Sequence, residues 1–196
     1  MNPREMTTVM PDETGILRAA EVLASGGIVA LPTESSWGLA VDALDERALS
    51  ALFMLKGRPP DQPPPIGILG EVMLGRLVAE VPPAARRLMD AWWPGPLTLV
   101  LPARPGLPQW IAPEGHVGVR ESPHRVVRAL LGAYGRPLTL TSANYSGAAP
   151  AMRSADLPAG VDLVLQGNAG GGAPSTIARV DADGKIAVLR RGPITL

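Results

Sequence analysis

Cysteine is absent from this chain of 196 residues, and histidine occurs only at His116 and His124. The first absence excludes disulfide bonds, thiolate metal sites and cysteine nucleophiles. Two histidines are too few for a metal site built on imidazole ligands. Aromatic residues make up only 4% of the chain, so aliphatic side chains and alanine must fill the core.

An excess of charge of either sign is also absent, because 18 basic and 18 acidic residues balance. Nucleic acid is therefore not attracted by the molecule as a whole, and any anion site must be local. No apolar run approaches membrane-spanning length, and Met1–Asp12 lacks the basic and then apolar pattern of a signal peptide. We therefore expect a soluble cytoplasmic protein without a membrane partner.

Glycine and proline are abundant, with 22 residues of each, and hydrophobic residues make up 46% of the chain. This composition is typical of a globular protein with many turns. The length suits one substantial core and is too short for two ordinary domains. We expect a single domain over residues 1–196, with a core at about 14–192 and a loosely ordered segment at 1–12.

Short apolar runs between helical patterns predict an α/β fold. The expected strands are 28–31, 66–69, 97–101, 117–120, 137–141, 161–165, 177–180 and 186–189. The expected flanking helices begin near Thr14, Asp45, Pro82 and Ser122. Asp181–Gly184 is a turn signal that predicts an antiparallel hairpin between the last two strands, so the sheet should be mixed, with parallel and antiparallel pairs.

The stretch 137–147 joins an apolar segment of strand character to short hydrogen-bonding side chains and a glycine. An α/β protein presents polar groups in this way at the end of a strand, where such folds bind ligands. Ser142 and Asn144 lie two residues apart, so continued strand geometry would point both toward one ligand. The alternative is a Ser/Asn turn that only ends the strand.

Lys56 and Arg58 lie at the end of an expected helix. Cations at this position ordinarily complement the helix dipole and the unpaired carbonyl groups. The prolines at 59, 60 and 63–65 stiffen the chain just beyond them, which would hold both cations in place. Fixed cations suit phosphate or carboxylate binding.

Further polar groups follow other expected strands. Thr33–Ser36 and Arg120 each follow or end a strand, Ser175 comes after the run Gly170–Gly172, and Arg190 leaves the last strand. If these groups converge, they form a basic, hydroxyl-lined cavity that suits a polyphosphate.

Each group also has an ordinary interpretation. The Thr33–Ser36 loop could be a solvated turn, and Arg120 could be a surface residue paired with Glu114 or Glu121. The glycine run could be a flexible connection, or its backbone N–H groups could approach an anion.

In chain order, these segments resemble the YrdC-like family of threonylcarbamoyl-AMP synthases, in its short form without an extra C-terminal domain. The matching segments are LPTE at 31–34, WGL at 37–39, KGRP at 56–59, PGPLT at 94–98, GVR at 118–120, TSAN at 141–144, SG at 146–147, STI at 175–177 and LR at 189–190. Each segment is short, and the specificity lies in the ordered set.

The resemblance implies a twisted mixed sheet with flanking helices around an open basic cavity. It also implies a nucleotidyltransferase that makes L-threonylcarbamoyl-adenylate from L-threonine, bicarbonate and ATP and releases pyrophosphate. The adenylate serves N6-threonylcarbamoyladenosine modification at position 37 of tRNA, so tRNA or tRNA-modification proteins are the implied partners.

The resemblance also implies roles for individual residues. The family's catalytic signature contacts the ATP phosphates, and it falls on Lys56, Arg58, Ser142 and Asn144. Arg190 is implied as a further phosphate ligand. Mg²⁺ is expected to be held by the ATP phosphates and not by a protein metal site.

The residues implied for L-threonine or its carbamate are Thr33, Arg120 and Ser175. The planar guanidinium of Arg120 suits the threonine carboxylate.

The chain departs from the family at Trp37, where tyrosine is usual, and at Gln62–Pro65, where Pro-Leu is usual. These changes affect the shape of the expected substrate pocket. Two alternative functions stay open at this point. One is an RNA-binding or nucleotide-binding module without synthetase activity, and the other is a carbamoyl-adenylate enzyme.

Overall fold

The computed structural model describes residues 6–196, and these residues form two mixed sheets. The helices are α1 (Glu13–Ala24), α2 (Glu46–Lys56), α3 (Gly70–Leu77), α4 (Pro83–Trp92) and α5 (Arg125–Tyr134), with a short 3-10 turn at Ser154–Asp156. The strands are β1 (Thr7–Val9), β2 (Val29–Pro32), β3 (Trp37–Ala40), β4 (Ile66–Gly67), β5 (Leu97–Pro102), β6 (His116–Arg120), β7 (Leu138–Thr139), β8 (Thr141–Ser142), β9 (Leu163–Leu165), β10 (Thr176–Val180) and β11 (Ile186–Arg190).

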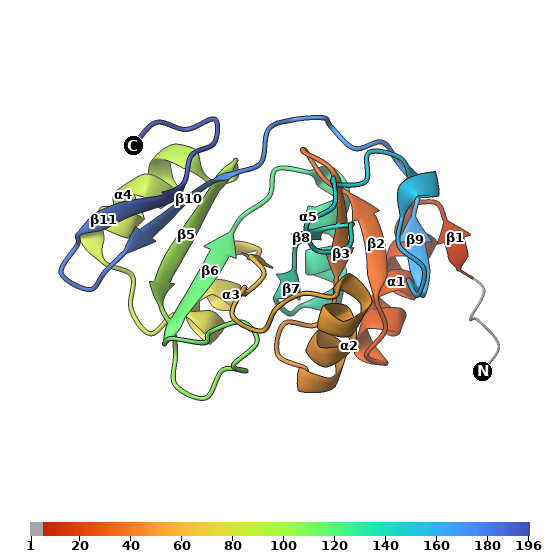
Figure 1. Cartoon of the computed structure of the whole chain (residues 1–196), viewed down its shortest axis with the longest axis horizontal. Coiled ribbons are helices and arrows are strands. Elements are labelled where there is room, and N and C mark those ends of the chain that lie inside the picture. Colours follow the sequence, from red (N-terminus) through yellow and green to blue (C-terminus); the bar gives the residue numbers. More distant parts are fainter. Residues whose placement is uncertain (1–5) are drawn as a thin grey trace.

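The α/β class with mixed strand directions is confirmed, and the strands divide between two sheets. One sheet has five strands in the order β1-β9-β2-β3-β8, and the other has six in the order β11-β10-β5-β6-β4-β7. Each contains parallel and antiparallel pairs, including the antiparallel hairpin of β10 and β11. Figure 1 shows the larger sheet with α3 and α4 on one half of the molecule and the smaller sheet with α1 and α2 on the other.

The segment 138–142 connects the two sheets, which corrects the prediction of one continuous strand at 137–141. Thr139 pairs with Ile66 of the six-stranded sheet, whereas Ser142 pairs with Gly38 of the five-stranded sheet. Between them, the Leu140 N–H donates to the Pro65 carbonyl at 2.8 Å. The ladder therefore changes partners at Leu140, and Ser142 reaches the space between the sheets.

Two helix boundaries illustrate how the local sequence sets the chain direction. The side chain of Asp12 accepts from the Gly15 N–H and begins α1, so the expected cap at Thr14 is wrong by two positions. Asp45 caps α2 as predicted. Gly57, with φ 57°, ends α2 in the left-handed region that glycine adopts without strain, and this turns the chain so that Arg58 leaves the helix axis.

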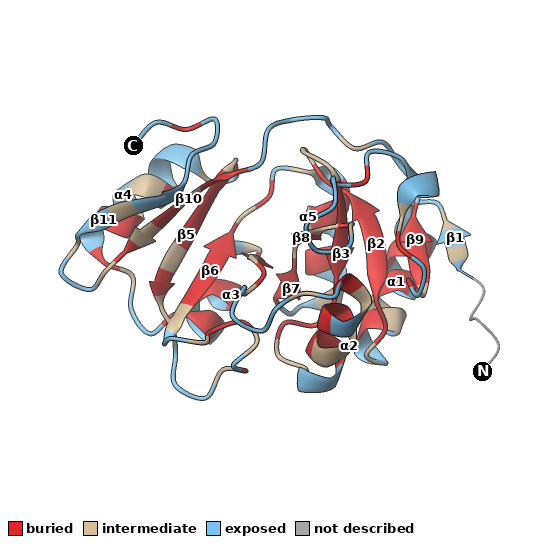
Figure 2. Ribbon diagram, viewed as in Figure 1, coloured by how far each residue is buried: buried red, intermediate tan, exposed pale blue. Residues whose placement is uncertain are grey.

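The core is aliphatic, as the scarcity of aromatic residues predicts, and Trp37 is the largest fully buried side chain. The central strands of both sheets are buried, whereas β11 at the edge of the larger sheet is mostly exposed (Figure 2). Part of the segment 1–12, which was expected to be loosely ordered, forms β1 because Thr7–Val9 pairs in parallel with β9. Residues 1–5 lie outside the described part of the chain.

Within residues 6–196, none of the helices combines the length and the apolar character that crossing a bilayer requires.

Candidate active site

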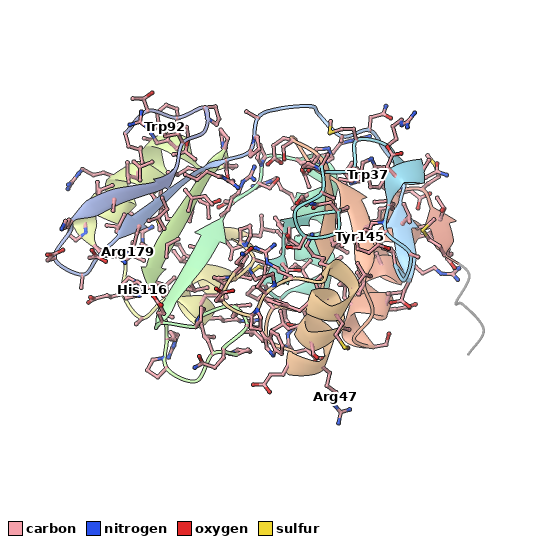
Figure 3. All side chains as sticks on the ribbon, in the orientation of Figure 1. Trp37, Arg47, Trp92, His116, Tyr145 and Arg179 are labelled. Carbon is pink, nitrogen blue, oxygen red and sulfur yellow. The ribbon has the colours of Figure 1, made fainter. Side chains whose placement is uncertain are left out.

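A cavity of about 560 Å³ lies between the two sheets and is lined by residues from both. Six of the eight predicted site residues line it, namely Thr33, Arg58, Arg120, Ser142, Ser175 and Arg190. Figure 3 shows Trp37 and Tyr145 on the half of the molecule that holds β2 and β3, and His116 and Arg179 on the half that holds β5 and β6. Segments that are far apart in the sequence therefore converge on one basic, hydroxyl-lined cavity.

Lys56 and Asn144 do not line this cavity, and Lys56 lies behind it. The Lys56 side chain is fully buried, and its ammonium group donates to the Ser142 carbonyl at 2.5 Å, the Asn144 carbonyl at 2.7 Å and Asn144 Oδ1 at 3.3 Å. Burial, with a smaller contribution from Arg58, lowers the pKa of Lys56 to about 8. Lys56 therefore fastens the 142–144 turn to the end of α2.

Ser142 and Asn144 are hydrogen-bonded to each other across this turn. Ser142 Oγ donates to Asn144 Oδ1 at 2.5 Å, while Asn144 Nδ2 donates to the carbonyl groups of Tyr145 and Ala148 at 3.0 and 2.7 Å. Both sequence interpretations hold in part, because Asn144 stabilises a turn and Ser142 faces the cavity. The turn thus sets the position of the Ser142 hydroxyl.

The proline-rich segment after α2 holds Arg58, as the sequence predicts. Arg58 Nε donates to the Gln62 carbonyl at 2.5 Å and Nη2 to the Pro63 carbonyl at 3.2 Å, while Nη1 donates to Thr141 Oγ1 at 3.1 Å. Burial lowers the pKa of Arg58, but an arginine stays charged at neutral pH. The result is a positive charge at a fixed position on the cavity wall.

Arg120 also lines the cavity, at the end of β6. Its side chain is 10% exposed, Nε donates to the Gly95 carbonyl at 3.2 Å, and Nη2 forms a salt bridge with Glu34. Burial and then Arg190 lower the pKa of Arg120 to about 10, so the guanidinium is charged at neutral pH. The alternative of a surface arginine paired with Glu114 or Glu121 is wrong, since Glu121 pairs with Arg128 instead.

The remaining predicted residues are linked by hydroxyl contacts. Arg190 Nη2 donates to Ser175 Oγ at 3.1 Å, and Ser175 Oγ lies 2.9 Å from Thr98 Oγ1. Thr33 Oγ1 donates to the Ser36 carbonyl at 2.7 Å and closes the 33–36 turn. Thr98 belongs to the PGPLT segment at 94–98, but sequence reasoning assigned it no role.

Glu34 and Ser122 are cavity residues that the sequence-based assignment of roles left out. Ser122 Oγ donates to Glu34 Oε2 at 2.7 Å, and the other carboxylate oxygen faces Arg120. Glu34 is part of the LPTE segment, so its place in the motif was visible. Its ion-pair partner, Arg120, is 86 positions away along the chain, and no local pattern could have identified this pair.

The glycine run packs directly against the 33–35 turn. The N–H groups of Gly170, Gly171 and Gly172 donate to the carbonyl groups of Thr33, Ser35 and Glu34 at 2.9, 2.9 and 3.1 Å. The suggestion that these N–H groups are available to an anion is therefore wrong. The run connects β9 to β10 and crosses from one sheet to the other (Figure 1).

We expect Gly170→Ala to lower both stability and activity. A Cβ at this position would lie 2.5 Å from the Glu34 carbonyl oxygen, so the turn that carries Thr33 and Glu34 must shift. Such overpacking costs about 1–3 kcal/mol in the free energy of unfolding, measured by urea denaturation. Gly75→Ala in α3 is the matched control, because a Cβ there meets nothing within 4 Å, and it should gain about 1 kcal/mol. Equal behaviour of the two variants would contradict the packing role.

The lowered pKa of Lys56 predicts opposite effects of pH on activity and stability. The pKa falls from 10.5 in the unfolded chain to about 8 in the folded protein, so the unfolded chain binds more protons between these values. The free energy of unfolding should therefore rise with pH in that window, relative to Lys56→Met. Activity should fall over the same range, because the 142–144 turn loses its cationic partner. Parallel pH profiles for the wild type and Lys56→Met would contradict the assignment.

The cavity offers little to a protein-bound metal ion. Among residues 6–196, no group of three or more His, Cys, Asp or Glu side chains is placed to hold a metal. Glu34 is the acidic side chain on the cavity wall, and it is already engaged by Arg120 and Ser122. These residues fit a divalent ion only when phosphate oxygens supply most of its ligands, as is usual for Mg²⁺ with nucleotides.

A second cavity, of about 570 Å³, lies at β1 and β9 and contains none of the eight predicted site residues.

Two mixed sheets with an arginine-lined cavity between them define an α/β protein with a cavity lined by basic and hydroxyl side chains. The Sua5/YciO/YrdC family model, described as "Telomere recombination", matches residues 21–192. The chain belongs to this family.

Similar proteins extend over most of the chain. The threonylcarbamoyl-AMP synthase of Xanthomonas euvesicatoria pv. vesicatoria is 39% identical over 186 residues, which is 90% of this chain and 98% of that protein. The synthase of Halorhodospira halophila is 37% identical over 161 residues, which cover 80% of this chain and 84% of that protein.

Among solved structures, P. abyssi Sua5 complexed with L-threonine is similar with a TM-score of 0.83 and 32% identity. The match covers 95% of this chain and 56% of that one, so this chain spans little more than half of P. abyssi Sua5. E. coli YciO has a TM-score of 0.83 at 24% identity, with 96% of both chains covered, and supports the fold alone.

Proposed function

We propose that this protein is a threonylcarbamoyl-AMP synthase, which makes L-threonylcarbamoyl-adenylate from L-threonine, bicarbonate and ATP. The observation that carries the proposal is the convergence of Arg58, Arg120 and Arg190 with serine and threonine hydroxyls in one cavity. Full-length relatives carrying the synthase name support it. So does the L-threonine complex of P. abyssi Sua5.

The proposed reaction needs no protein nucleophile. The threonine amine and bicarbonate give N-carboxy-threonine with release of water, and a carbamate oxygen then attacks the α-phosphorus of ATP. The new oxygen–phosphorus bond replaces the bond to pyrophosphate, which leaves with its electron pair. Such a displacement depends on positioning, neutralisation of charge and exclusion of water.

We assign the phosphate side of the cavity to the region around the 142–144 turn. Arg58, Ser142 and Arg190 are proposed to contact phosphate oxygens, and Mg²⁺ is proposed to enter with ATP, held by its phosphates. Lys56 and Asn144 belong to the same group, and their contacts in the structure suggest that they act largely by holding this turn. A direct phosphate contact by Lys56 would require one of its three protein acceptors to be replaced.

We assign the threonine side to the region around Arg120. We assign the threonine carboxylate to the guanidinium of Arg120, with Thr33 and Ser175 as hydroxyl partners of the amino acid or its carbamate. This places the amino acid and the triphosphate in one cavity of about 560 Å³, as transfer between them requires. The adenylate would then serve N6-threonylcarbamoyladenosine formation in tRNA, with the help of separate partner proteins in the cytoplasm.

The test is a pyrophosphate-release assay with ATP, Mg²⁺ and labelled bicarbonate, supplied with threonine, carbamoyl phosphate or no further substrate. Threonine-dependent release together with a labelled adenylate is expected. Release with carbamoyl phosphate alone would indicate a carbamoyl-adenylate enzyme, and no release under any condition would indicate a binding module. Either of these results would remove the proposed function.

A further inference from the structure

The cavity contains an internal ion pair in the place that the proposed function gives to the amino acid. Glu34 forms a salt bridge with Arg120, and its other oxygen accepts from Ser122 Oγ at 2.7 Å. The Glu34 side chain is 23% exposed and lines the cavity, whereas Arg120 is 10% exposed. A ligand entering the cavity therefore meets the carboxylate of this pair together with the guanidinium behind it.

A substrate carboxylate that takes over the Arg120 Nη2 contact of Glu34 must replace the Glu34 carboxylate there. Arg120 cannot move aside easily, because Nε is held by the Gly95 carbonyl. The backbone of Glu34 is also fixed, since the Gly172 N–H donates to its carbonyl at 3.1 Å. Exchange therefore requires rotation of the Glu34 side chain with both backbones in place.

The displaced Glu34 carboxylate needs a new cationic partner. A carboxylate left unpaired in a partly desolvated cavity would oppose ligand binding. The ammonium group of an α-amino acid supplies that partner next to the incoming carboxylate. A zwitterion can thus insert between Arg120 and Glu34, replacing one ion pair with two and leaving the net charge of the cavity unchanged.

We propose that Glu34 is a specificity-determining residue that receives the ammonium group of the amino-acid substrate when the substrate carboxylate takes its place on Arg120. The inference rests on the proposed function, which it deepens. It explains why an acidic side chain lies in a cavity otherwise suited to anions. It also predicts that carboxylates without an ammonium group bind poorly, because they displace the Glu34 carboxylate without providing it with a new cationic partner.

The test compares two ligands in the wild type and in Glu34→Gln. One is L-threonine, and the other is (R)-3-hydroxybutyrate, which is L-threonine with the ammonium group replaced by hydrogen. We expect Glu34→Gln to bind L-threonine about tenfold or more weakly, measured by calorimetry or NMR titration. The same variant should bind (R)-3-hydroxybutyrate detectably and at least as tightly as the wild type, because Arg120 has lost its internal competitor.

Three results for Glu34→Gln would overturn the inference. The affinity for threonine could be unchanged, or the affinities for both ligands could fall equally. Threonine binding could also be lost while no binding of (R)-3-hydroxybutyrate is detected. An equal loss would mean that Glu34 only supports Arg120. Glu114→Gln, on the exposed surface, is the matched control, and ATP binding and thermal unfolding verify that Glu34→Gln is folded.

The proposed function and this inference can fail independently in these experiments. If the wild type binds L-threonine but forms no adenylate, the proposed function fails and the inference is still decided by the two ligands. If the wild type forms adenylate and Glu34→Gln keeps the wild-type preference between the ligands, only the inference fails.

Discussion

Replacing Lys56 with alanine is expected to slow threonine-dependent adenylate formation by about 100-fold or more, the range seen when a positioned polar group of a catalytic site is removed. The Lys56 ammonium group holds the carbonyl groups of Ser142 and Asn144, and without it the 142–144 turn has no cationic partner. The Ser142 hydroxyl would then lose its fixed position on the phosphate side. Steady-state assays at pH 7 with varied ATP measure the effect.

The sequence offers a clean control, because Lys185 is the only other lysine in the chain. Lys185 is exposed in the β10–β11 hairpin, and Lys185→Ala should keep wild-type activity. Lys56→Met, which fills most of the same volume, separates loss of the charge from a cavity in the core. A Lys56→Met protein that unfolds like the wild type and makes the adenylate as fast would contradict the role of this residue.

Replacing Arg120 with lysine is expected to raise the KM for threonine by about 100-fold, with a much smaller change in the KM for ATP. Lysine keeps the positive charge but lacks the planar pair of donors that can hold a carboxylate and the Gly95 carbonyl together. Loss of such a charge-assisted contact is worth about 1.5–3 kcal/mol, and the misplaced charge adds to it. The measurement is initial rate against threonine concentration at saturating ATP and bicarbonate.

Arg128→Lys is the matched control for this prediction. Arg128 pairs with Glu121 and does not line the cavity, so the Arg128→Lys enzyme should have wild-type kinetics. An Arg120→Lys enzyme in which the KM for ATP rises as much as the KM for threonine would place Arg120 on the phosphate side instead.

Local sequence signals predicted most of the elements that position the site, but neither strand β3 nor the division into two sheets. Asp45 begins α2 as expected, because a cap is a local property. The change of sheet at Leu140 depends on Pro65 and Gly38, which are distant in sequence and compete for the same short segment. No pattern within 137–141 could show it.

The candidate site was likewise predicted only in part. Six residues that line the cavity were predicted from polar groups at strand ends and from the resemblance to a family, and the fold brings them together. The indirect place of Lys56, the Glu34–Arg120 pair and the contact of the glycine run with the 33–35 turn were not predicted. Each of these contacts joins residues that are far apart in the sequence and that have several possible partners. Only the packed structure determines which partner each residue contacts.

The most direct test of the proposed chemistry is a mass spectrum of the product made from ¹³C-bicarbonate, ¹⁵N-threonine and ATP. Condensation in one cavity predicts an adenylate that carries both labels, formed together with pyrophosphate. An adenylate with the carbon label but no nitrogen label, or the absence of any labelled adenylate from folded protein that binds ATP, would contradict it.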